Sequence, residues 1–565
     1  MLSEEIIECD VLVIGGGGAG ARAAIEAEGY NLEVTLVDKG LFGRSGCTRL
    51  AGGINAAIGH VDSRDNCDLH FNDTIEAGLN LNNQKLTRIL VDEAPRRLVE
   101  VESWGAIFDR QPNGKMKQQP GGGMTYPRYI TGRGDAAGKE LITTLSNEAL
   151  HCGVDVMNNL IVTSLLTDNK RVVGAAGVEM KMGGFTVIKA KATVIATGSG
   201  CELYPLTSNP VGSSGDGFAM AYKAGAELID MEMVQFHPTG ICFPGILRGL
   251  IGSEVGFFGA LGAILVNAKG ERFMSRYDPD RMEHNTRDVI SRCEYMEIRA
   301  GRGTDNGGVY LDLRPIPFDV RKNSIPVAEG EFYELCLDSG IDFTEQPLEI
   351  APSAHYFMGG LKIDEVCRTT LPGLYAAGGA AGGVHGANRV RGNSLAELLV
   401  FGTIAGEQAA RYAKSFRKGS IRKNQVEAER ARVYGFLGNK SEQCIRPSYM
   451  KKRLQDLSWR KLGVVRNEEE LRDAILKIQK MKGDSEKLCT SRSQSSYNLE
   501  WIEAIEVCNL LEVAEMIGMS ALRRRESRGA HYRDDYPKRD DANWLRHMVI
   551  SKAGVKAIPV EMVGD

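Results

Sequence analysis

The sequence predicts an α/β fold that begins with a nucleotide-binding β–α–β unit. An apolar run at residues 9–14 leads into a glycine-rich segment, 15–20, and then into a helix-forming segment, 21–27. Two further apolar runs, at 192–198 and 373–378, also end in glycine turns. Runs of this kind are typical of buried strands in a parallel sheet, so they predict further strands beside the first.

The composition indicates a globular protein of several domains. The chain has 565 residues, of which 43% are hydrophobic and 25% charged, with a formal net charge of −4. This balance argues against a nucleic-acid partner. The sequence has no apolar run long enough to span a membrane and begins with acidic residues rather than a secretory signal, so we expect a cytoplasmic protein without a direct membrane span. The 66 glycines, about 12% against a usual share of about 7%, indicate close backbone approaches to a ligand.

The 12 cysteines predict no metal site in this chain. They are scattered, with no C-x-x-C and no pair at zinc or iron–sulfur spacing. We therefore expect reduced structural thiols, including a packed rather than redox-active Cys47. Any iron–sulfur cluster that the function requires would come from another subunit.

The first 38 residues contain a complete dinucleotide fingerprint. Gly15, Gly17 and Gly20 form G-x-G-x-x-G between the first strand and the first helix, and the second strand, 33–37, ends at Asp38. The glycines let a pyrophosphate approach the helix N-terminus, where free N–H groups bind anions. The acid follows at about the 20-residue distance that suits a ribose hydroxyl. This context predicts a Rossmann-like domain, but leaves NAD and FAD open.

Two observations favour FAD. There is no second G-x-G-x-x-G motif, and the strand at 192–198 ends in the Ala-Thr-Gly turn common in FAD proteins of this architecture. FAD domains of this kind often carry an inserted domain. We therefore expect a split FAD-binding domain, 1–240 and 351–405, with an inserted α+β capping domain at 241–350.

The C-terminal third changes in pattern. Helical apolar periodicity at 468–481 and 499–520 predicts a helical domain over residues 406–520, followed by a C-terminal tail region, 521–565. One helix would bury a stripe formed by Trp501, Ile505, Leu510, Leu511 and Ala514. The charged stretch 523–547 is interpreted as a solvated face, with a docking surface as the alternative.

Several motifs together resemble one family. They are Gln235–Gly240, Thr286–Val289, Met296–Gly303, His355–Gly360, His385–Arg389, Asn393–Leu395 and Glu526–His531. With the fingerprint, they resemble the flavoprotein subunit of succinate dehydrogenase and fumarate reductase, whose relatives include L-aspartate oxidase, over nearly the whole chain. The long segment after Glu526–His531 looks like the dehydrogenase/reductase branch.

The resemblance implies that the substrate is a C4 dicarboxylate, fumarate or succinate, held at both carboxylates. Hydride would pass between flavin N5 and one carbon, while Arg287, which matches the family's general acid, protonates the other. Glu254 matches a relay glutamate, but the second relay arginine and glutamate of the family are missing after it, so proton delivery must differ. The substrate-binding side chains that match are His237, Ser253, His355 and Arg389.

The resemblance also assigns residues to FAD. Gly46 stands where membrane-bound relatives attach the flavin to a histidine, which predicts non-covalent FAD, and Gly379 replaces a usual glutamate. In this family, loss of the covalent bond generally implies a lower flavin potential, which favours fumarate reduction. The matching cofactor residues are Gly15, Gly17, Gly18, Ala19, Gly20, Asp38, Lys39, Ser45, Gly46, Thr48, Gly52, Gly53, Thr197, Gly198, Asp216, Gly379, Asn393, Ser394 and Leu395.

Three functions follow from these motifs. The leading one is the catalytic subunit of a fumarate reductase or succinate dehydrogenase, which exchanges electrons with an iron–sulfur subunit that draws on quinol or on thiols. The second is a self-contained L-aspartate oxidase. The third is an FAD electron-relay subunit without dicarboxylate turnover, which the altered segment after Glu254 keeps open.

Overall fold

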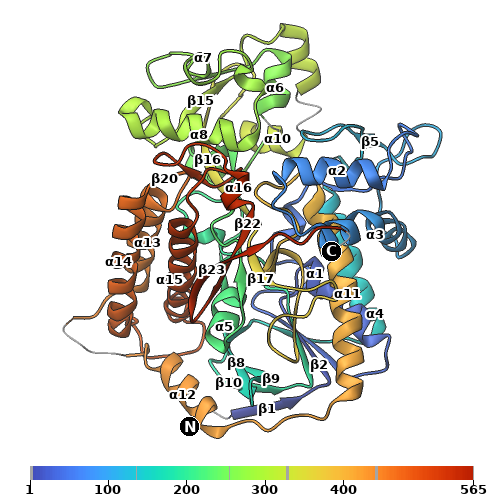
Figure 1. The fold of residues 1–565 in the computed structure, drawn as a ribbon, viewed down its shortest axis with the longest axis vertical. Coiled ribbons are helices and arrows are strands. Elements are labelled where there is room, and N and C mark those ends of the chain that lie inside the picture. The colour runs from blue at the N-terminus through green and yellow to red at the C-terminus, as the bar shows by residue number, and fades with distance from the viewer. Residues whose placement is uncertain (1–3, 135, 253–254, 326–329, 439–442, 564–565) are drawn as a thin grey trace.

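The fold is built around a parallel sheet that carries the fingerprint. The computed structural model describes residues 4–134, 136–252, 255–325, 330–438 and 443–563 (Figure 1). The sheet has the order β18-β11-β2-β3-β7, and all neighbours in it are parallel. Its strands are β18 (Leu374–Ala376), β11 (Ala192–Ile195), β2 (Val11–Ile14), β3 (Val34–Asp38) and β7 (Asp155–Asn158). Every residue of β2, β3 and β11 is buried, which explains their apolar runs.

Helices and a second sheet cover this parallel sheet. Helix α1 packs against α11 and α4, and α11 also contacts α3. The helices are α1 (Gly18–Glu28), α2 (Cys67–Ala77), α3 (Gln84–Ser103), α4 (Ala137–Cys152), α5 (Asp216–Ala224) and α11 (Asn393–Ser415). The second sheet has the order β1-β10-β9-β8, with β1 (Glu4–Glu8), β10 (Phe185–Lys189), β9 (Arg171–Glu179) and β8 (Leu160–Asp168). A small third sheet consists of β4 (Gly53–Asn55), β6 (Tyr129–Thr131) and β5 (Gln118–Gln119).

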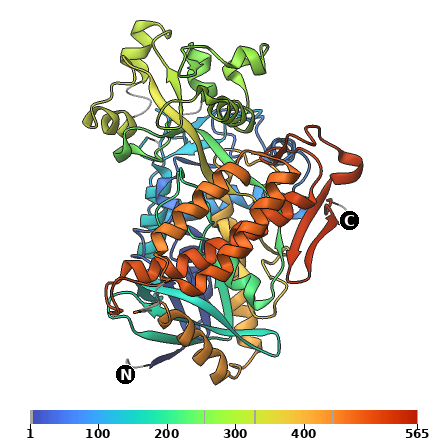
Figure 2. The same ribbon diagram turned by 90° about the vertical axis from the view of Figure 1, so that its left-hand side faces the viewer.

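A separate layer lies at one end of the molecule, at the top of Figures 1 and 2. Its own hydrophobic core consists of side chains between Ile241 and Ile350. Its sheet is β13 (Val234–Ile241), β16 (Leu348–Phe357), β15 (Val309–Asp312) and β14 (Ile264–Val266), in that order. Its helices are α6 (Val255–Leu261), α7 (Met274–Tyr277), α8 (Arg287–Glu297) and α10 (Glu331–Asp338). Strands β13 and β16 join this layer to the rest of the chain, so residues on them can face both parts.

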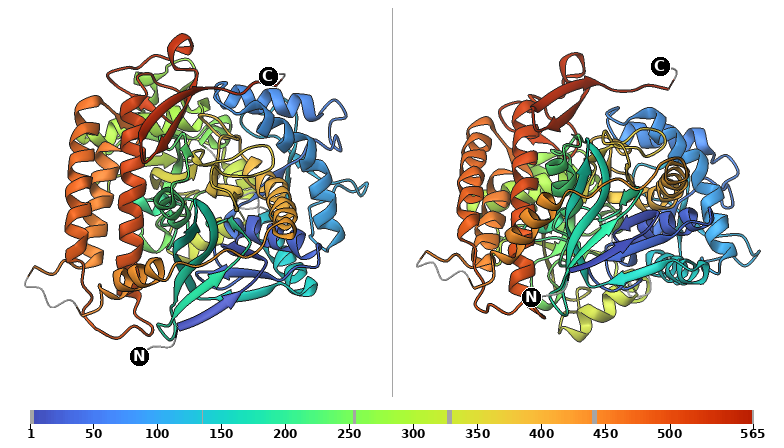
Figure 3. Two further views of the ribbon diagram at one scale, coloured as in Figure 1. Left: turned by 60° about the horizontal axis from the view of Figure 1, so that its bottom comes forward. Right: turned by 90° about the horizontal axis from the view of Figure 1, so that it is seen from below.

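Three long helices form a further layer along one side of the molecule (Figures 2 and 3). They are α13 (Pro447–Lys461), α14 (Glu468–Asp484) and α15 (Leu499–Arg523), preceded by α12 (Lys423–Tyr434). The predicted stripe on α15 is buried at all five positions. The Asn467 and Asn498 side chains cap α14 and α15 by accepting backbone N–H bonds.

The C-terminal segment pairs with the body of the protein. Strand β22 (Arg546–Ser551) joins a sheet of order β19-β17-β12-β22-β23, formed with β19 (Ala381–Gly382), β17 (Gly360–Lys362), β12 (Leu228–Ile229) and β23 (Gly554–Pro559). Strand β21 (Tyr532–Arg533) pairs with β20 (Val465–Arg466), and α16 (Asp541–Trp544) lies between β21 and β22. Single turns complete the fold: η1 (Thr48–Leu50), η2 (Cys201–Leu203), η3 (Gly245–Leu247), η4 (Met282–His284), η5 (Ile298–Arg302), η6 (Val320–Ser324), η7 (Gly378–Ala380) and η8 (Ser485–Lys487).

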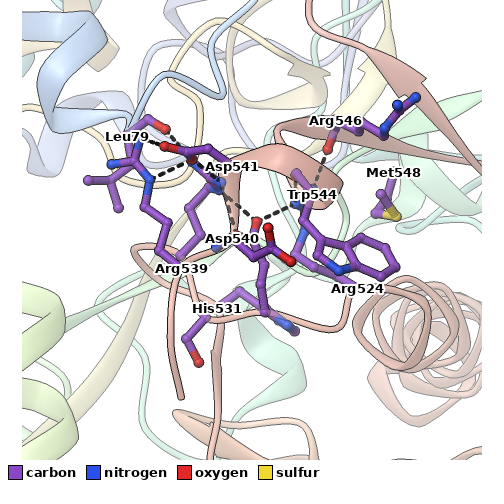
Figure 4. A network of polar contacts seen from close by, with 12 residues as sticks. Leu79, Arg524, His531, Arg539, Asp540, Asp541, Trp544, Arg546 and Met548 are labelled. Atoms are coloured by element: carbon purple, nitrogen blue, oxygen red, sulfur yellow. Dashed lines mark hydrogen bonds and ion pairs between the residues drawn. The ribbon is translucent and has the colours of Figure 1, made fainter. Parts of the chain in front are cut away.

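The interpretation of 523–547 as a solvated face is wrong for its central charges. Arg524, Glu526 and His531 have no exposed surface, and Arg528 is only 2% exposed. Arg524 donates to Glu232 at 2.8 Å and to Glu526 at 2.9 Å. It also donates to the carbonyl oxygens of Trp544 and Arg546 (Figure 4). Buried charges are tolerated because each has partners, and here the partners come from distant parts of the chain.

The expectation of reduced cysteines is wrong for one pair. Cys444 and Cys489 form a disulfide, and the flanking residues Ile445 and Leu488 form a parallel bridge. The two cysteines are 45 residues apart, so no short spacing motif could indicate the pair. No helix among the described residues is long and apolar enough to cross a membrane.

Candidate active site

One large cavity connects the fingerprint with the two motif histidines. Its volume is about 1230 Å³, above the range of about 300–1,000 Å³ usual for small-molecule pockets. The β2–α1 loop, the end of β3 and the turn after β11 line one part of it, and His237, His355 and Arg389 line another. A nucleotide cofactor and a small anionic substrate could therefore share this space.

The fingerprint loop has the backbone that a pyrophosphate requires. Gly15 has φ +109°, and a Cβ there would lie 2.4 Å from the Ala196 carbonyl oxygen. A Cβ at Gly20 would lie 1.8 Å from the Gly15 carbonyl oxygen. Helix α1 begins at Gly18 without an acidic residue in its first turn, so its N-terminus favours an anion.

The strand ends beside this loop carry polar groups suited to a nucleotide. Asp38 accepts hydrogen bonds from the Gly40 N–H at 2.7 Å and from the Ser45 hydroxyl at 2.6 Å. The buried Thr197 hydroxyl oxygen, on the turn after β11, has no hydrogen-bond partner within the described protein. A buried polar atom without a partner, next to a glycine-rich loop, is expected where a bound cofactor would supply the missing hydrogen bond. The residues present therefore suit FAD.

Lys39, Asp216 and Glu506 form a partly buried ionic cluster at this part of the cavity. The Lys39 ammonium donates to Asp216 and to Glu506 on α15, both at 2.8 Å. Burial alone would lower the pKa of Lys39, but the two carboxylates outweigh burial and raise the pKa above its ordinary value. Because α15 supplies Glu506, the helical layer helps to shape the predicted cofactor site.

Most of the predicted cofactor residues line the cavity, and two do not. Gly20 packs against Gly15 instead. The Asn393 side chain supports the loop before α11: its oxygen contacts Asn55 at 2.7 Å and His70 at 2.9 Å. The residues that line the cavity are Gly15, Gly17, Gly18, Ala19, Asp38, Lys39, Ser45, Gly46, Thr48, Gly52, Gly53, Thr197, Gly198, Asp216, Gly379, Ser394 and Leu395. Their contacts with FAD stay predictions.

Cys47 also lines this cavity, so the expected packed thiol is wrong. Its side chain is exposed and its sulfur donates to the Asn209 side-chain oxygen at 3.2 Å. The cavity walls nevertheless shield the sulfur from bulk water, and this desolvation raises the pKa of the Cys47 thiol to about 11. The thiolate, the reactive form, is therefore scarce at neutral pH.

The two motif histidines lie next to each other on paired strands. His237 on β13 pairs with Ser353 of β16, and Ser353 is two residues before His355 on that strand. The centroids of the two imidazole rings are 5.2 Å apart. His355 Nδ1 contacts the Ser208 hydroxyl at 2.7 Å, and His237 Nδ1 contacts the Thr239 hydroxyl at 3.0 Å. Both contacts use Nδ1, so Nε2 is the ring atom through which each histidine could bond a ligand.

Arginines surround these histidines. Burial, followed by the charge of Arg287, holds the pKa of His237 well below its ordinary value, and burial with neighbouring positive charge does the same for His355. Both rings are therefore neutral at pH 7. Burial and the charge of Arg287 also lower the pKa of Arg389 to about 10. This region of the cavity is built for an anion.

Separate elements position the two predicted arginines. Arg287 is the first residue of α8, where the helix dipole also favours an anion. The Arg389 guanidinium carbon lies 4.5 Å from the centroid of the Tyr356 ring. Tyr356 donates in turn to Glu397, which His385 contacts at 3.0 Å. Ser253 and Glu254 lie outside the described residues, although their neighbour Gly252 lines the cavity.

Several residues of this region were not predicted from the sequence. Ser208 and Arg391 line the cavity, and Thr239 orients His237. Thr239 and Tyr356 lie inside the two histidine motifs, so the motifs could have indicated them. Ser208 has no such signal, because only the fold brings it to His355.

Two family models match this chain. The family described as "FAD binding domain" matches residues 10–395, and "Fumarate reductase flavoprotein C-term" matches residues 451–563. The chain is 44% identical over 552 residues to a subunit of the fumarate reductase (CoM/CoB) of Methanothermobacter marburgensis, covering 98% of each protein. It is 36% identical to a fumarate reductase flavoprotein subunit of Mycobacterium tuberculosis, covering 96% of this chain and 94% of the relative.

Solved structures give the same likeness. The Mycobacterium smegmatis Sdh1 complex matches with a TM-score of 0.90 and 34% identity, over 99% of this chain and 95% of the other. A variant of E. coli quinol fumarate reductase matches with a TM-score of 0.89 and 30% identity, over 99% and 98% of the two chains. The agreement extends through the capping layer and the C-terminal segment.

Proposed function

This chain belongs to the family of fumarate reductase and succinate dehydrogenase flavoprotein subunits and contains its FAD-binding domain, and we propose that it interconverts fumarate and succinate. One observation carries the proposal. Arg287, Arg389 and the two neutral histidines face the same cavity as the dinucleotide fingerprint. A dicarboxylate in that position would lie beside the cofactor.

Arg389 and the two histidines would contribute differently to the binding of a dianion. Arg389 supplies charge-assisted hydrogen bonds to a carboxylate, and its stacking on Tyr356 holds the guanidinium in place. Neutral His237 and His355 donate hydrogen bonds without adding charge, because burial keeps their pKa values low. When bound, FAD would supply hydride exchange with one carbon of the double bond.

Arg287 is proposed to donate the proton to the other carbon. A guanidinium holds its proton tightly, so the group must be reprotonated quickly for turnover. Glu254 is the proposed source. Positive charge from Arg287 and Arg389 would also stabilise the negative charge that develops on the substrate.

The cofactor is proposed to be held without a covalent bond. Gly46 lines the cavity with φ +77°, a conformation that favours glycine, and it offers no side chain for attachment. Acid precipitation should therefore release all the flavin into the supernatant. Flavin that stays with the precipitated protein would contradict this part of the proposal.

The electrons are proposed to come through an iron–sulfur partner subunit, with thiols as the donor. The relative from Methanothermobacter marburgensis is named as part of a CoM/CoB fumarate reductase, which supports a thiol donor over quinol. The cytoplasmic location stays a prediction.

The test is an anaerobic assay of the purified flavoprotein with reduced viologen dye. Fumarate should oxidise two molecules of the one-electron dye for each succinate formed. In a separate assay with oxygen as the electron acceptor, the L-aspartate oxidase alternative would oxidise aspartate to iminoaspartate, which hydrolyses and releases ammonia. Activity with aspartate and none with fumarate would overturn the proposal. Failure with both substrates would favour the electron-relay alternative.

A further inference from the structure

Arg391 lies in the loop that carries Arg389. The Asn55 side chain of β4 donates to the Arg391 carbonyl oxygen at 2.6 Å, and the Asn55 N–H donates to the Gly392 carbonyl oxygen at 3.2 Å. The loop is thus fixed to a strand beside the cavity. None of the sequence motifs had singled out Arg391.

An aromatic ring holds the Arg391 side chain. Its guanidinium carbon lies 4.3 Å from the centroid of the Tyr129 ring, and Tyr129 on β6 is 2% exposed. Stacking on an aromatic ring holds a guanidinium in one orientation. Its N–H groups then point outward in the guanidinium plane, where a carboxylate can accept hydrogen bonds from them. The arrangement repeats that of Arg389 over Tyr356, where the corresponding distance is 4.5 Å.

The charge of Arg391 acts on both motif histidines. It lines the cavity together with Arg287 and Arg389. Its charge, after burial and Arg287, lowers the pKa of His237, and it also contributes to the lowered pKa of His355. Three guanidinium groups therefore act on the same pair of imidazole rings.

We infer that Arg391 is a third cationic ligand-binding residue of this site and that it sets a preference for a dianion over a monoanion. The inference rests on the proposed function. Like charges that share a buried region repel one another, and a dianionic ligand relieves this repulsion more than a monoanion does. Removing one guanidinium should therefore weaken dianion binding selectively.

The experiment compares the FAD-loaded wild type with Arg391→Gln and Arg391→Lys. The dianionic probe is malonate, which cannot be reduced, and the monoanionic probe is the monoamide of fumarate. Binding is followed by the change in flavin absorbance, and fumarate reduction is measured in parallel. Arg133→Gln is the matched control, because Arg133 lines the cavity but its side chain is 65% exposed and pairs with Glu140 at 2.8 Å.

We expect Arg391→Gln to raise the Kd for malonate at least about tenfold and the KM for fumarate similarly, as loss of a charge-assisted hydrogen bond does. The Kd for the monoamide should change less than about threefold, and FAD content and kcat should stay near wild type. Arg391→Lys should recover part of the affinity because it restores the charge. Arg133→Gln should leave both Kd values unchanged.

Three outcomes would contradict the inference. An unchanged Kd for malonate in Arg391→Gln would remove Arg391 from the site while the wild type still reduced fumarate. An equal loss for both probes, or loss of FAD, would show a structural role instead. A wild type that neither binds malonate nor reduces fumarate would overturn the proposed function and this inference with it.

Discussion

Gly20 shows at the scale of a residue how little space the nucleotide loop leaves. Gly20→Ala should abolish FAD retention, because the new Cβ would lie 1.8 Å from the Gly15 carbonyl oxygen and force the loop apart. The ratio of flavin to protein after purification measures this. Gly483→Ala is the control: Gly483 lies in α14, and a Cβ there meets no heavy atom within 4 Å. That variant should keep its FAD and gain up to about 1 kcal/mol of stability. Full FAD retention by Gly20→Ala would contradict the description of the loop.

His70 predicts an acid-sensitive stability. Burial, followed by the charge of Arg128, lowers the pKa of His70 to about 4, below the ordinary 6.5. Between these two values the unfolded chain binds more protons than the folded protein. The free energy of unfolding should therefore fall as the pH drops from 6.5 to 4, by up to about 3 kcal/mol from this residue alone.

Denaturant unfolding at several pH values tests the His70 prediction. His70→Gln removes the titrating ring but keeps an amide able to reach Asn393. The variant should lose less stability between pH 6.5 and pH 4 than the wild type does. Equal losses in both proteins would show that His70 is not the source, since buried His531 shifts in the same direction.

At the scale of elements, the C-terminal segment depends on Arg524. Arg524→Ala would leave buried Glu232 without its ion-pair partner, whereas Glu526 would keep Arg528, and the change should cost about 3–5 kcal/mol in the free energy of unfolding. Arg539→Ala is the surface control. Its side chain is 34% exposed and pairs with Asp541, so its loss should cost less than about 1 kcal/mol. Similar costs for both variants in denaturant unfolding would contradict the buried network.

The elements also show what local sequence can predict. The β2–α1–β3 unit was predictable because its apolar runs, glycines and terminal acid are adjacent in the chain and act locally. The burial of Arg524 was not, because its partner Glu232 is 292 residues away and a charged run looks the same whether solvated or paired. The Cys444–Cys489 disulfide and the Ser208–His355 contact escaped prediction for the same reason. The family motifs indicated the histidines and arginines but gave no indication of Arg391.

At the scale of the whole molecule, each layer contributes residues to the cavity. The parallel sheet supplies the fingerprint, β13 and β16 supply the histidines, α8 supplies Arg287 and α15 supplies Glu506. The predicted limits of the split FAD domain, 1–240 and 351–405, and of the capping domain, 241–350, stay predictions, although one separate core does lie between Ile241 and Ile350. Because residues from distant layers meet at one cavity, substrate binding and flavin chemistry can be coupled there.

A single-turnover measurement tests most directly whether this cavity reduces a dicarboxylate with Arg287 as the proton donor. The bound flavin is reduced anaerobically with dithionite, excess reductant is removed, and fumarate is added while the oxidised-flavin absorbance is followed. The wild type should reoxidise rapidly and form one succinate per FAD. Arg287→Ala with full FAD content should be slower by at least about 100-fold, the lower end of what general acids contribute. A wild type that fumarate does not reoxidise, or an Arg287→Ala variant that reoxidises at the wild-type rate, would contradict these assignments.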